Sequence, residues 1–338
     1  MKTHIQNFTN HINHAIEIAD SSVGCLNLDN ISNIVISGQG GSGIAGYIVK
    51  NIFYNQILVP VIVNQDYKVP EFINENTLFI SSSYSGNTEE TITAFNTAIS
   101  KKCKVICICS DGELLSLAKK NKCHYILLPK GGAPRAMLGY SLIQLLYILQ
   151  SFQFGDEGIS VLKKELISIS NLLFKQQKAI VELAKSIADR IGKRMPFIYT
   201  YPELEGAAVR FKQQLNENSK RHALCNIIPE MNHNEIVGWS RNTMCSVPVF
   251  INGNSTQANK KRLEITISQI SDRVDDCIII DYNTTSHIEE YFYFIHLVDW
   301  VSLFIAENDG VDPDEIDAIH FFKNELKKHN YENYSGLV

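Results

Sequence analysis

The sequence has no apolar run that approaches a membrane-spanning helix, which needs about 18 consecutive apolar residues. Its first ten residues, MKTHIQNFTN, have no apolar core of the kind that a signal peptide carries. It also has no excess of basic residues, because the formal net charge is −5 and the isoelectric point is about 6.1. Nucleic acids and anionic membranes bind basic faces, so we expect neither as a partner.

None of the eight cysteines forms a C-x-x-C pair. Several lie in apolar runs such as KVICICS (104–110), where a free thiol packs as a small hydrophobic group. This pattern argues against a disulfide framework and indicates a reducing compartment. No two histidines have the H-x-x-x-H spacing of a metal-binding helix. We therefore expect a cytoplasmic protein that uses no metal.

The chain has 338 residues, about twice the usual length of one domain. Short apolar runs alternate with helical patterns along it, which predicts an α/β fold with parallel sheets. We expect two tandem domains, 1–153 and 154–338, each a parallel β-sheet flanked by helices in a three-layer sandwich. The predicted strands are 33–38, 57–63, 77–83, 104–110, 124–129, 196–201, 223–229, 246–251 and 276–281. The last predicted helix runs from about Pro313 to Lys328.

The stretch SSSYSGNTEET (81–91) joins a predicted strand to a predicted helix. Ligands bind at this position in parallel sheets, and the start of the helix offers unpaired N–H groups. Hydroxyl groups of Ser83, Ser85 and Thr88 add donors, while Gly86 lets the backbone approach a ligand closely. These features predict a neutral phosphate-binding loop.

Helix capping is the alternative interpretation of the same stretch. It accounts for Asn87 or Thr88 as the N-cap and for Glu90 in the first turn. It does not account for the four serines that precede them, which are Ser81, Ser82, Ser83 and Ser85. We therefore favour the anion site.

A second loop, SGQGGSGIAG (37–46), follows the first predicted strand. Its glycines resemble a dinucleotide fingerprint, but no acidic residue follows at the distance of about 20 residues that ribose binding requires. We therefore expect no NAD and no other cofactor. Gly41 and Ser42 are instead predicted to line the same phosphate pocket as the serine-rich loop.

Both loops together resemble the SIS (sugar isomerase) domain, a five-stranded parallel sheet with flanking helices. Further stretches resemble the bifunctional phosphoglucose/phosphomannose isomerase family. These stretches are GGAPRAMLGYSL (131–142), QLNENSK (214–220), PEMNHNEIVGW around His233 and GVDPDEIDAIHFFKNELKK (310–328). The resemblance implies two tandem SIS domains, of which the first keeps the phosphate loop.

The family's reaction passes through an enediolate, and the resemblance implies the role of each residue. Glu217 matches the base, His233 a ring-opening histidine, Arg135 the cation that faces the enediolate, and Lys323 a lysine that assists ring opening. In the family this histidine comes from the neighbouring subunit, which implies a homodimer. Each of these residues also has a purely structural interpretation. It could be an ordinary surface side chain or, for Arg135, the ion-pair partner of a nearby acidic residue.

The sequence therefore favours a metal-free enzyme that isomerises glucose 6-phosphate or mannose 6-phosphate to fructose 6-phosphate and back. Another SIS-type sugar-phosphate isomerase and a non-catalytic sugar-phosphate-binding protein are the alternatives. A sensor would need an effector module, and about 30 residues before the first predicted strand leave little room for one. An isomerase of another sugar could lack the pairing of NEN with NHNE.

Overall fold

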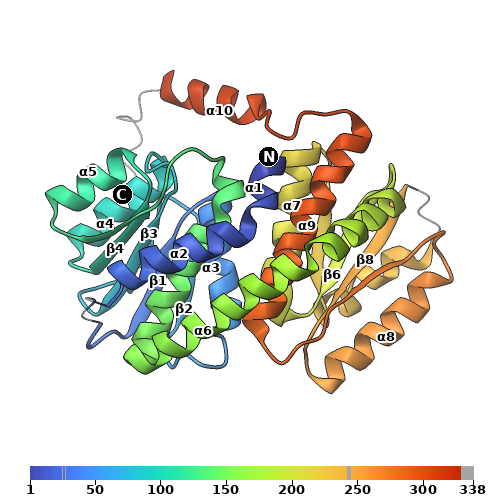
Figure 1. Ribbon diagram of the computed structural model, residues 1–338, viewed down its shortest axis with the longest axis horizontal. Helices are drawn as coiled ribbons and strands as arrows, with labels where there is room; N and C mark the ends of the chain where they lie inside the picture. Colours follow the sequence, from blue (N-terminus) through green and yellow to red (C-terminus); the bar gives the residue numbers. More distant parts are fainter. Residues whose placement is uncertain (25, 27, 242–244, 329–338) are drawn as a thin grey trace.

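The computed structural model describes residues 1–24, 26, 28–241 and 245–328. Two parallel β-sheets lie side by side with helices packed around them, which confirms the predicted α/β fold class (Figure 1). The first sheet has the strand order β2-β1-β3-β4-β5, and the second has the order β7-β6-β8-β9. The strands are β1 (Asn33–Ser37), β2 (Val61–Asn64), β3 (Thr77–Ser82), β4 (Lys104–Cys109), β5 (His124–Leu127), β6 (Met195–Thr200), β7 (Leu224–Ile227), β8 (Ser246–Asn252) and β9 (Ile278–Asp281).

The second sheet differs from the five-stranded expectation, because its described part contains four strands. After β9 the chain enters a long helix directly instead of forming another strand. The α-helices are α1 (Lys2–Gln6), α2 (Phe8–Ser22), α3 (Gly40–Ile52), α4 (Glu89–Ser100), α5 (Gly112–Lys120), α6 (Leu138–Ile191), α7 (Glu205–Ser219), α8 (Gln257–Ser271), α9 (His287–Asp309) and α10 (Asp317–Lys328). Short 3₁₀ helices are η1 (Pro134–Met137), η2 (Pro202–Leu204), η3 (Glu230–His233) and η4 (Glu235–Ser240).

Strands β1 and β3 are buried along their whole length, as expected for central strands covered by helices on both faces. They are hydrogen-bonded neighbours, with Ser37 opposite Ser81. Because parallel strands end at the same edge of a sheet, the loops that follow β1 and β3 are adjacent. The two loops predicted to share a pocket therefore lie together.

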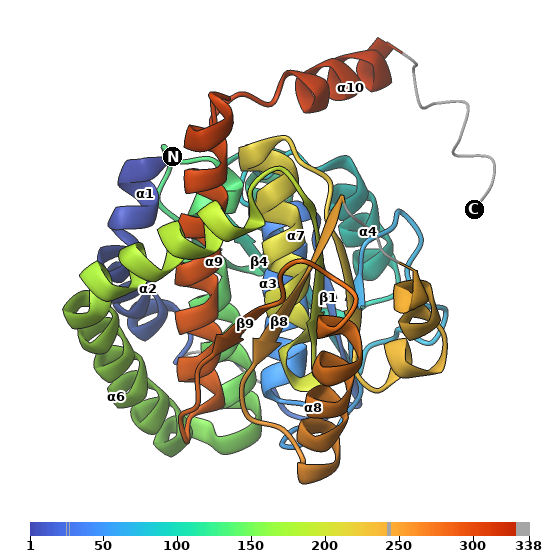
Figure 2. The same ribbon diagram turned by 90° about the vertical axis from the view of Figure 1, so that its right-hand side faces the viewer.

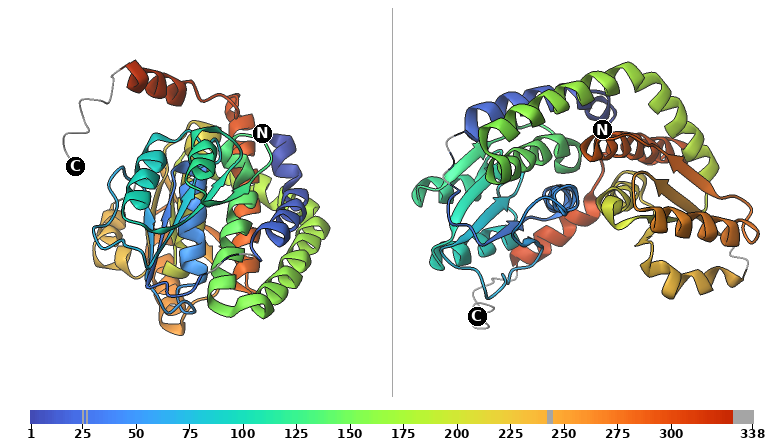
Figure 3. Two further views of the ribbon diagram at one scale, coloured as in Figure 1. Left: turned by 90° about the vertical axis from the view of Figure 1, so that its left-hand side faces the viewer. Right: turned by 90° about the horizontal axis from the view of Figure 1, so that it is seen from below.

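Helix α6 passes from the first sheet to the second along one side of the molecule (Figure 3, right). Gly155 interrupts it, with φ 61° and ψ −155°, close to the predicted domain boundary. The division into 1–153 and 154–338 stays a prediction. Among the described residues, no helix combines the length and apolar character that crossing a membrane requires.

Helices α3 and α7 pack against each other where the two halves of the chain meet. A Cβ added at Gly206 would lie 2.9 Å from the Ile48 side chain, so glycine allows the close approach. Asn51 on α3 donates to the Pro202 carbonyl at 3.1 Å and accepts from the Gly206 amide at 3.2 Å. These contacts bring α7, which carries Glu217, beside the first sheet.

The C-terminal helix begins at Asp317 and not at Pro313, where the sequence predicted it. The preceding segment is not helical, and the Pro313 carbonyl accepts a hydrogen bond from Arg135. Helix α10 extends away from the body of the molecule (Figure 2). Phe321 and Phe322 on it are 68% and 61% exposed.

Candidate active site

The serine-rich loop runs from the end of β3 to the start of α4. The Ser83 hydroxyl lies 2.8 Å from the Thr88 hydroxyl, and Ser83 is buried. Thr88 occupies the N-cap position, yet its side chain accepts no hydrogen bond from the helix. Side-chain capping by Thr88 therefore does not explain the loop, and the first turn of α4 keeps N–H groups available for an anion.

Gly86 fixes the shape of this loop. Its φ is +71°, and a Cβ there would lie 1.7 Å from the Asp111 carbonyl oxygen, so no other residue fits. Ser85 is exposed at the tip of the loop, where its hydroxyl accepts from the Asn87 amide at 3.3 Å. The loop after β4 thus supports the serine-rich loop from one side.

The glycine-rich loop after β1 supports it from the other side. The Ser42 hydroxyl accepts a hydrogen bond from the Tyr84 amide at 3.2 Å. A Cβ added at Gly41 would lie 2.9 Å from the Pro134 carbonyl oxygen, so this glycine lets η1 pack directly on α3. The residues predicted to bind phosphate therefore lie next to the segment that carries Arg135.

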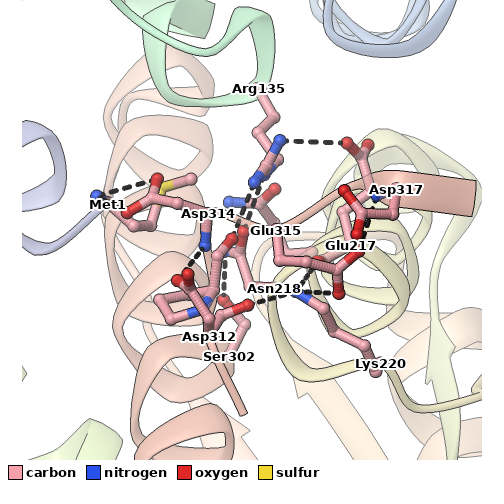
Figure 4. Close-up of polar contacts among 12 residues, drawn as sticks. Met1, Arg135, Glu217, Asn218, Lys220, Ser302, Asp312, Asp314, Glu315 and Asp317 are labelled. Carbon is pink, nitrogen blue, oxygen red and sulfur yellow. Dashed lines mark hydrogen bonds and ion pairs between the residues drawn. The ribbon is translucent and has the colours of Figure 1, made fainter. Parts of the chain in front are cut away.

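Arg135 is buried, with an exposed fraction of 3%. Its guanidinium points from η1 toward the end of α7 and the segment after α9 (Figure 4). Nε donates to Asn218 Oδ1 at 2.8 Å, Nη2 donates to the Pro313 carbonyl at 2.7 Å, and Nη1 lies 3.4 Å from Glu217 Oε2. Burial lowers the pKa of Arg135, and the Glu217 carboxylate opposes this shift. Arg135 is therefore no surface arginine but a fixed, desolvated cation.

Glu217 lies in the last turn of α7, and its side chain is 27% exposed. Its carboxylate faces Arg135, so it is not a solvated helix glutamate. One side of it stays open to a ligand, which a general base requires. The neighbouring Asn218, a poor helix former in the NEN stretch, supplies the acceptor that orients Arg135.

His233 lies far from this pair within one chain. It ends η3, which follows the carboxyl end of β7, and its side chain is exposed. Helix α7 runs back from the carboxyl end of β6 to the amino end of β7, so Glu217 lies at the opposite end of the sheet. A helix of 15 residues spans roughly 22 Å. The single chain therefore does not bring His233 to Glu217.

Lys323 is exposed on α10, and its ammonium group makes no ion pair with any described residue. Lys323 is not in contact with Arg135 or Glu217 in the described part of the chain. The segment before α10 does reach that pair through the Pro313 carbonyl and through Lys220, which donates to the Glu217 carbonyl at 3.1 Å and to the Asp312 carbonyl. Sequence reasoning missed these backbone acceptors, which no residue-type pattern reveals.

The loop after β8 in the second sheet corresponds to the serine-rich loop after β3. Its polar groups are bonded to carboxylates of the chain. The buried Glu290 accepts from the Asn254 amide at 2.7 Å. The Ser255 hydroxyl lies 3.1 Å from both carboxylate oxygens of Glu203. Because negative charge already occupies this position, a phosphate group is disfavoured there. The loop after β3 is thus the better candidate for phosphate binding.

In the part of the chain that the structure describes, no group of three or more His, Cys, Asp or Glu side chains is arranged to hold a metal ion. The described cation nearest the candidate base is the Arg135 guanidinium, through the contact with Glu217 given above. The groups that the chain itself offers are the Glu217 carboxylate, the fixed Arg135 cation and the hydroxyl-rich loop 81–91, which is called the anion loop below.

The paired parallel sheets, the hydroxyl-rich loop after β3 and the facing carboxylate and cation form the arrangement that the sequence predicted for a sugar-phosphate isomerase. A family model described as "Bacterial phospho-glucose isomerase C-terminal SIS domain" matches residues 180–326. A bifunctional phosphoglucose/phosphomannose isomerase of Aquifex aeolicus is 37% identical over 301 residues, covering 88% of this chain and 91% of that protein. One from Caldicellulosiruptor bescii is 33% identical, covering 95% and 97%. The chain belongs to the bifunctional phosphoglucose/phosphomannose isomerase family.

Two further similarities show the breadth of this fold. The C-terminal domain of glucosamine-fructose-6-phosphate aminotransferase from Francisella tularensis superimposes with a TM-score of 0.75 at 18% identity, covering 93% of this chain and 97% of that one. A D-glucosamine-6-phosphate 4-epimerase of Sulfolobus acidocaldarius is 32% identical over 208 residues, or 61% of this chain and 64% of that protein. The fold alone therefore does not select one sugar.

Proposed function

We propose that this protein catalyses the reversible isomerisation of glucose 6-phosphate and mannose 6-phosphate with fructose 6-phosphate through an enediolate. The observation that carries the proposal is the pairing of Glu217 with the buried Arg135 at 3.4 Å, in a chain that also has the hydroxyl-rich loop of Ser83 and Thr88. The names of its relatives point to the same reaction.

In the proposed mechanism, the phosphate group is bound by Ser42, Ser83, Ser85 and Thr88 with the amides of the first turn of α4. The sugar then extends toward Arg135. This orientation uses the binding energy of the phosphate, which does not react, to position the carbons that do.

Glu217 then moves a proton between C2 and C1. The carboxylate removes the proton from one carbon and returns it to the other, while the hydroxyl proton of the enediol passes between O1 and O2. The substrate is therefore neither oxidised nor reduced overall. Negative charge develops on the oxygen of the enediolate, and the fixed Arg135 guanidinium stabilises it. The chain supplies the base and the cation itself, and the proposed reaction needs no metal and no organic cofactor.

The proposal includes a homodimer in which His233 serves the partner's site. Its support is that η3 and Glu217 lie at opposite ends of the second sheet, so His233 is available to another copy of the chain. An exposed histidine can transfer a proton to the ring oxygen near neutral pH. Lys323, on the extended helix α10, is proposed to assist the same ring-opening step.

We place the reaction in the cytoplasm. All seven cysteines in the described ranges are free thiols, and three of them are buried. Burial raises the pKa of Cys109 to about 11, which keeps that thiol protonated and unreactive. Free thiols in this number are typical of proteins in a reducing compartment.

The test is to incubate the purified protein with fructose 6-phosphate and separate the products, with and without EDTA. We expect glucose 6-phosphate and mannose 6-phosphate, at rates that EDTA does not change. If neither product forms, the proposed function is wrong. If EDTA abolishes turnover, the metal-free mechanism is wrong. A parallel incubation with glucosamine 6-phosphate checks the alternative of an enzyme acting on another sugar phosphate.

A further inference from the structure

A buried ion pair between α7 and α9 contacts the backbone of Arg135. Arg210 on α7 and Asp299 on α9 are 1% and 7% exposed. Arg210 donates to the carboxylate through Nε at 3.1 Å and through Nη2 at 2.9 Å. Gln214, one turn further along α7, adds a third donor to Asp299 at 2.8 Å.

The Arg210 guanidinium also reaches the backbone of Arg135. Its Nη2 donates to the Arg135 carbonyl oxygen at 2.6 Å. This contact ties η1, from the first half of the chain, to α7 and α9 from the second half. The main chain of Arg135 is therefore held by the Arg210 guanidinium, which two hydrogen bonds to Asp299 fix in place.

The side chain of Arg135 is connected to the same residue of α9 by a second route. Its Nε donates to Asn218, whose amide donates to the Ser302 hydroxyl at 3.0 Å. That hydroxyl donates to the Asp299 carbonyl at 2.8 Å. The hydrogen bonds thus form a closed circuit in which Asp299 anchors both the backbone and the guanidinium of Arg135.

We infer that Arg210 and Asp299 are positioning residues for the isomerisation and act through Arg135. The inference rests on the proposed function. Neither residue is exposed enough to touch substrate. A buried pair usually contributes little net stability over apolar residues of the same size, whereas a misplacement of about 1 Å in a catalytic group can lower the rate about 100-fold. Placement of Arg135 is therefore the role that the contacts favour.

The first variants to measure are Arg210→Lys and Ser302→Ala. Lysine keeps the charge of Arg210 but lacks the fork that bonds Asp299 and the Arg135 carbonyl together. Ser302→Ala removes one hydroxyl and keeps the core packed, so it tests the circuit even if the lysine variant fails to fold. Ser170→Ala is the matched control, because Ser170 is buried and bonds the Thr9 carbonyl outside the circuit.

For Arg210→Lys we expect kcat to fall about 10- to 100-fold and for Ser302→Ala about tenfold, with KM for fructose 6-phosphate within about threefold, because the anion loop is untouched. In the double variant Arg210→Lys/Arg135→Lys, the fold loss in kcat should be much smaller than the product of the two single fold losses, because both changes disturb the same cation.

The inference is wrong if folded Arg210→Lys and Ser302→Ala proteins keep the kcat of the Ser170→Ala control. It is also wrong if the losses in the double variant multiply, or if kcat falls only as melting temperature falls. Failure of the proposed function is distinguishable, because the unmodified protein would then form neither aldose phosphate. If the wild type turns over and Arg210→Lys and Ser302→Ala keep its kcat, this inference is rejected while the proposed function stands.

Discussion

The Arg135 guanidinium and the Glu217 carboxylate face each other across the meeting point of the two sheets, with Nη1 3.4 Å from Oε2, although 82 residues separate them in the chain. The distance exceeds the roughly 2.7–2.9 Å of a tight charge-assisted hydrogen bond. The guanidinium is instead held by Asn218 and by the Pro313 carbonyl. The pairing of Glu217 with Arg135 is therefore loose, and the carboxylate does not hold the guanidinium in place.

Glu217→Gln should lower kcat by about 10³-fold, since general acid–base catalysis contributes typically 10² to 10⁴. KM for fructose 6-phosphate should change less than about threefold, because the anion loop is intact. Steady-state kinetics on the purified variant measures both. Glu205→Gln, at the other end of the same helix, is the control and should keep wild-type kcat. Turnover by Glu217→Gln within about tenfold of wild type would contradict the assignment.

Removing the paired hydroxyls of the anion loop should weaken substrate binding with little effect on chemistry. Ser83→Ala and Thr88→Ala should each raise KM about tenfold, because a hydrogen bond to a charged group contributes about 1.5–3 kcal/mol. Ser85→Ala tests the exposed tip of the loop in the same way. Thr97→Ala, whose hydroxyl bonds the Thr93 carbonyl on the same helix, is the control. Equal falls in kcat for loop variants and for Glu217→Gln would reject the separation of roles.

Shared sites predict that two inactive variants can restore each other. In hybrids of Glu217→Gln with His233→Ala, one site of each mixed dimer has an intact glutamate and an intact histidine. After subunit exchange at equal concentrations, about a quarter of wild-type activity should return. Mixing each variant with itself is the control. No recovery in a mixture shown to contain hybrid dimers would mean that both residues act within one chain.

Two buried histidines should make stability fall as pH falls. Burial lowers the pKa of His296 to about 4, and burial with the charges of His4 and His14 lowers that of His11 to about 4. A lowered pKa gives stability that is present above about pH 6.5 and lost toward pH 4, because the unfolded chain takes up the proton first. Between pH 7 and pH 5, each histidine should lower the free energy of unfolding by about 2 kcal/mol.

Replacing His296 by phenylalanine should remove about half of this pH dependence. Denaturant unfolding at pH 7 and pH 5 gives the difference directly. The exposed His222 is the control, and His222→Phe should keep the wild-type difference. If His296→Phe leaves the difference unchanged, burial of that imidazole does not control acid stability.

Most strand positions were predictable because buried parallel strands are short continuous apolar runs bounded by turn residues. The run at 57–63 is the exception, since β2 begins only at Val61. The run at 104–110 forms β4 (Lys104–Cys109), and the run at 77–83 forms β3 (Thr77–Ser82). The predicted C-terminal helix begins four residues too early, at Pro313 instead of Asp317. The Pro313 carbonyl accepts a hydrogen bond from Arg135, which is a tertiary contact. No local pattern contains that information.

The site was predictable to a different degree for each residue. The serine-rich loop could be read from chemistry, while Glu217 and Arg135 were found by resemblance, since a helix glutamate is usually solvated. Arg210 and Asp299 were missed. A signal was present in the sequence, because Asp299 interrupts the apolar stretch of α9 and Arg210 stands between the apolar residues Val209 and Phe211. Their pairing across 89 residues needed the structure.

Solvent exchange at the substrate's carbon tests the central claim, that Glu217 moves a proton through an enediolate held by Arg135. Fructose 6-phosphate is converted in D₂O, and the product glucose 6-phosphate is analysed by NMR for deuterium at C2. A proton carried by a carboxylate exchanges with solvent, so the account predicts deuterium at C2 with the wild type and no measurable labelled product with Glu217→Gln. Full conversion with no deuterium at C2 would indicate hydride transfer and would contradict the account.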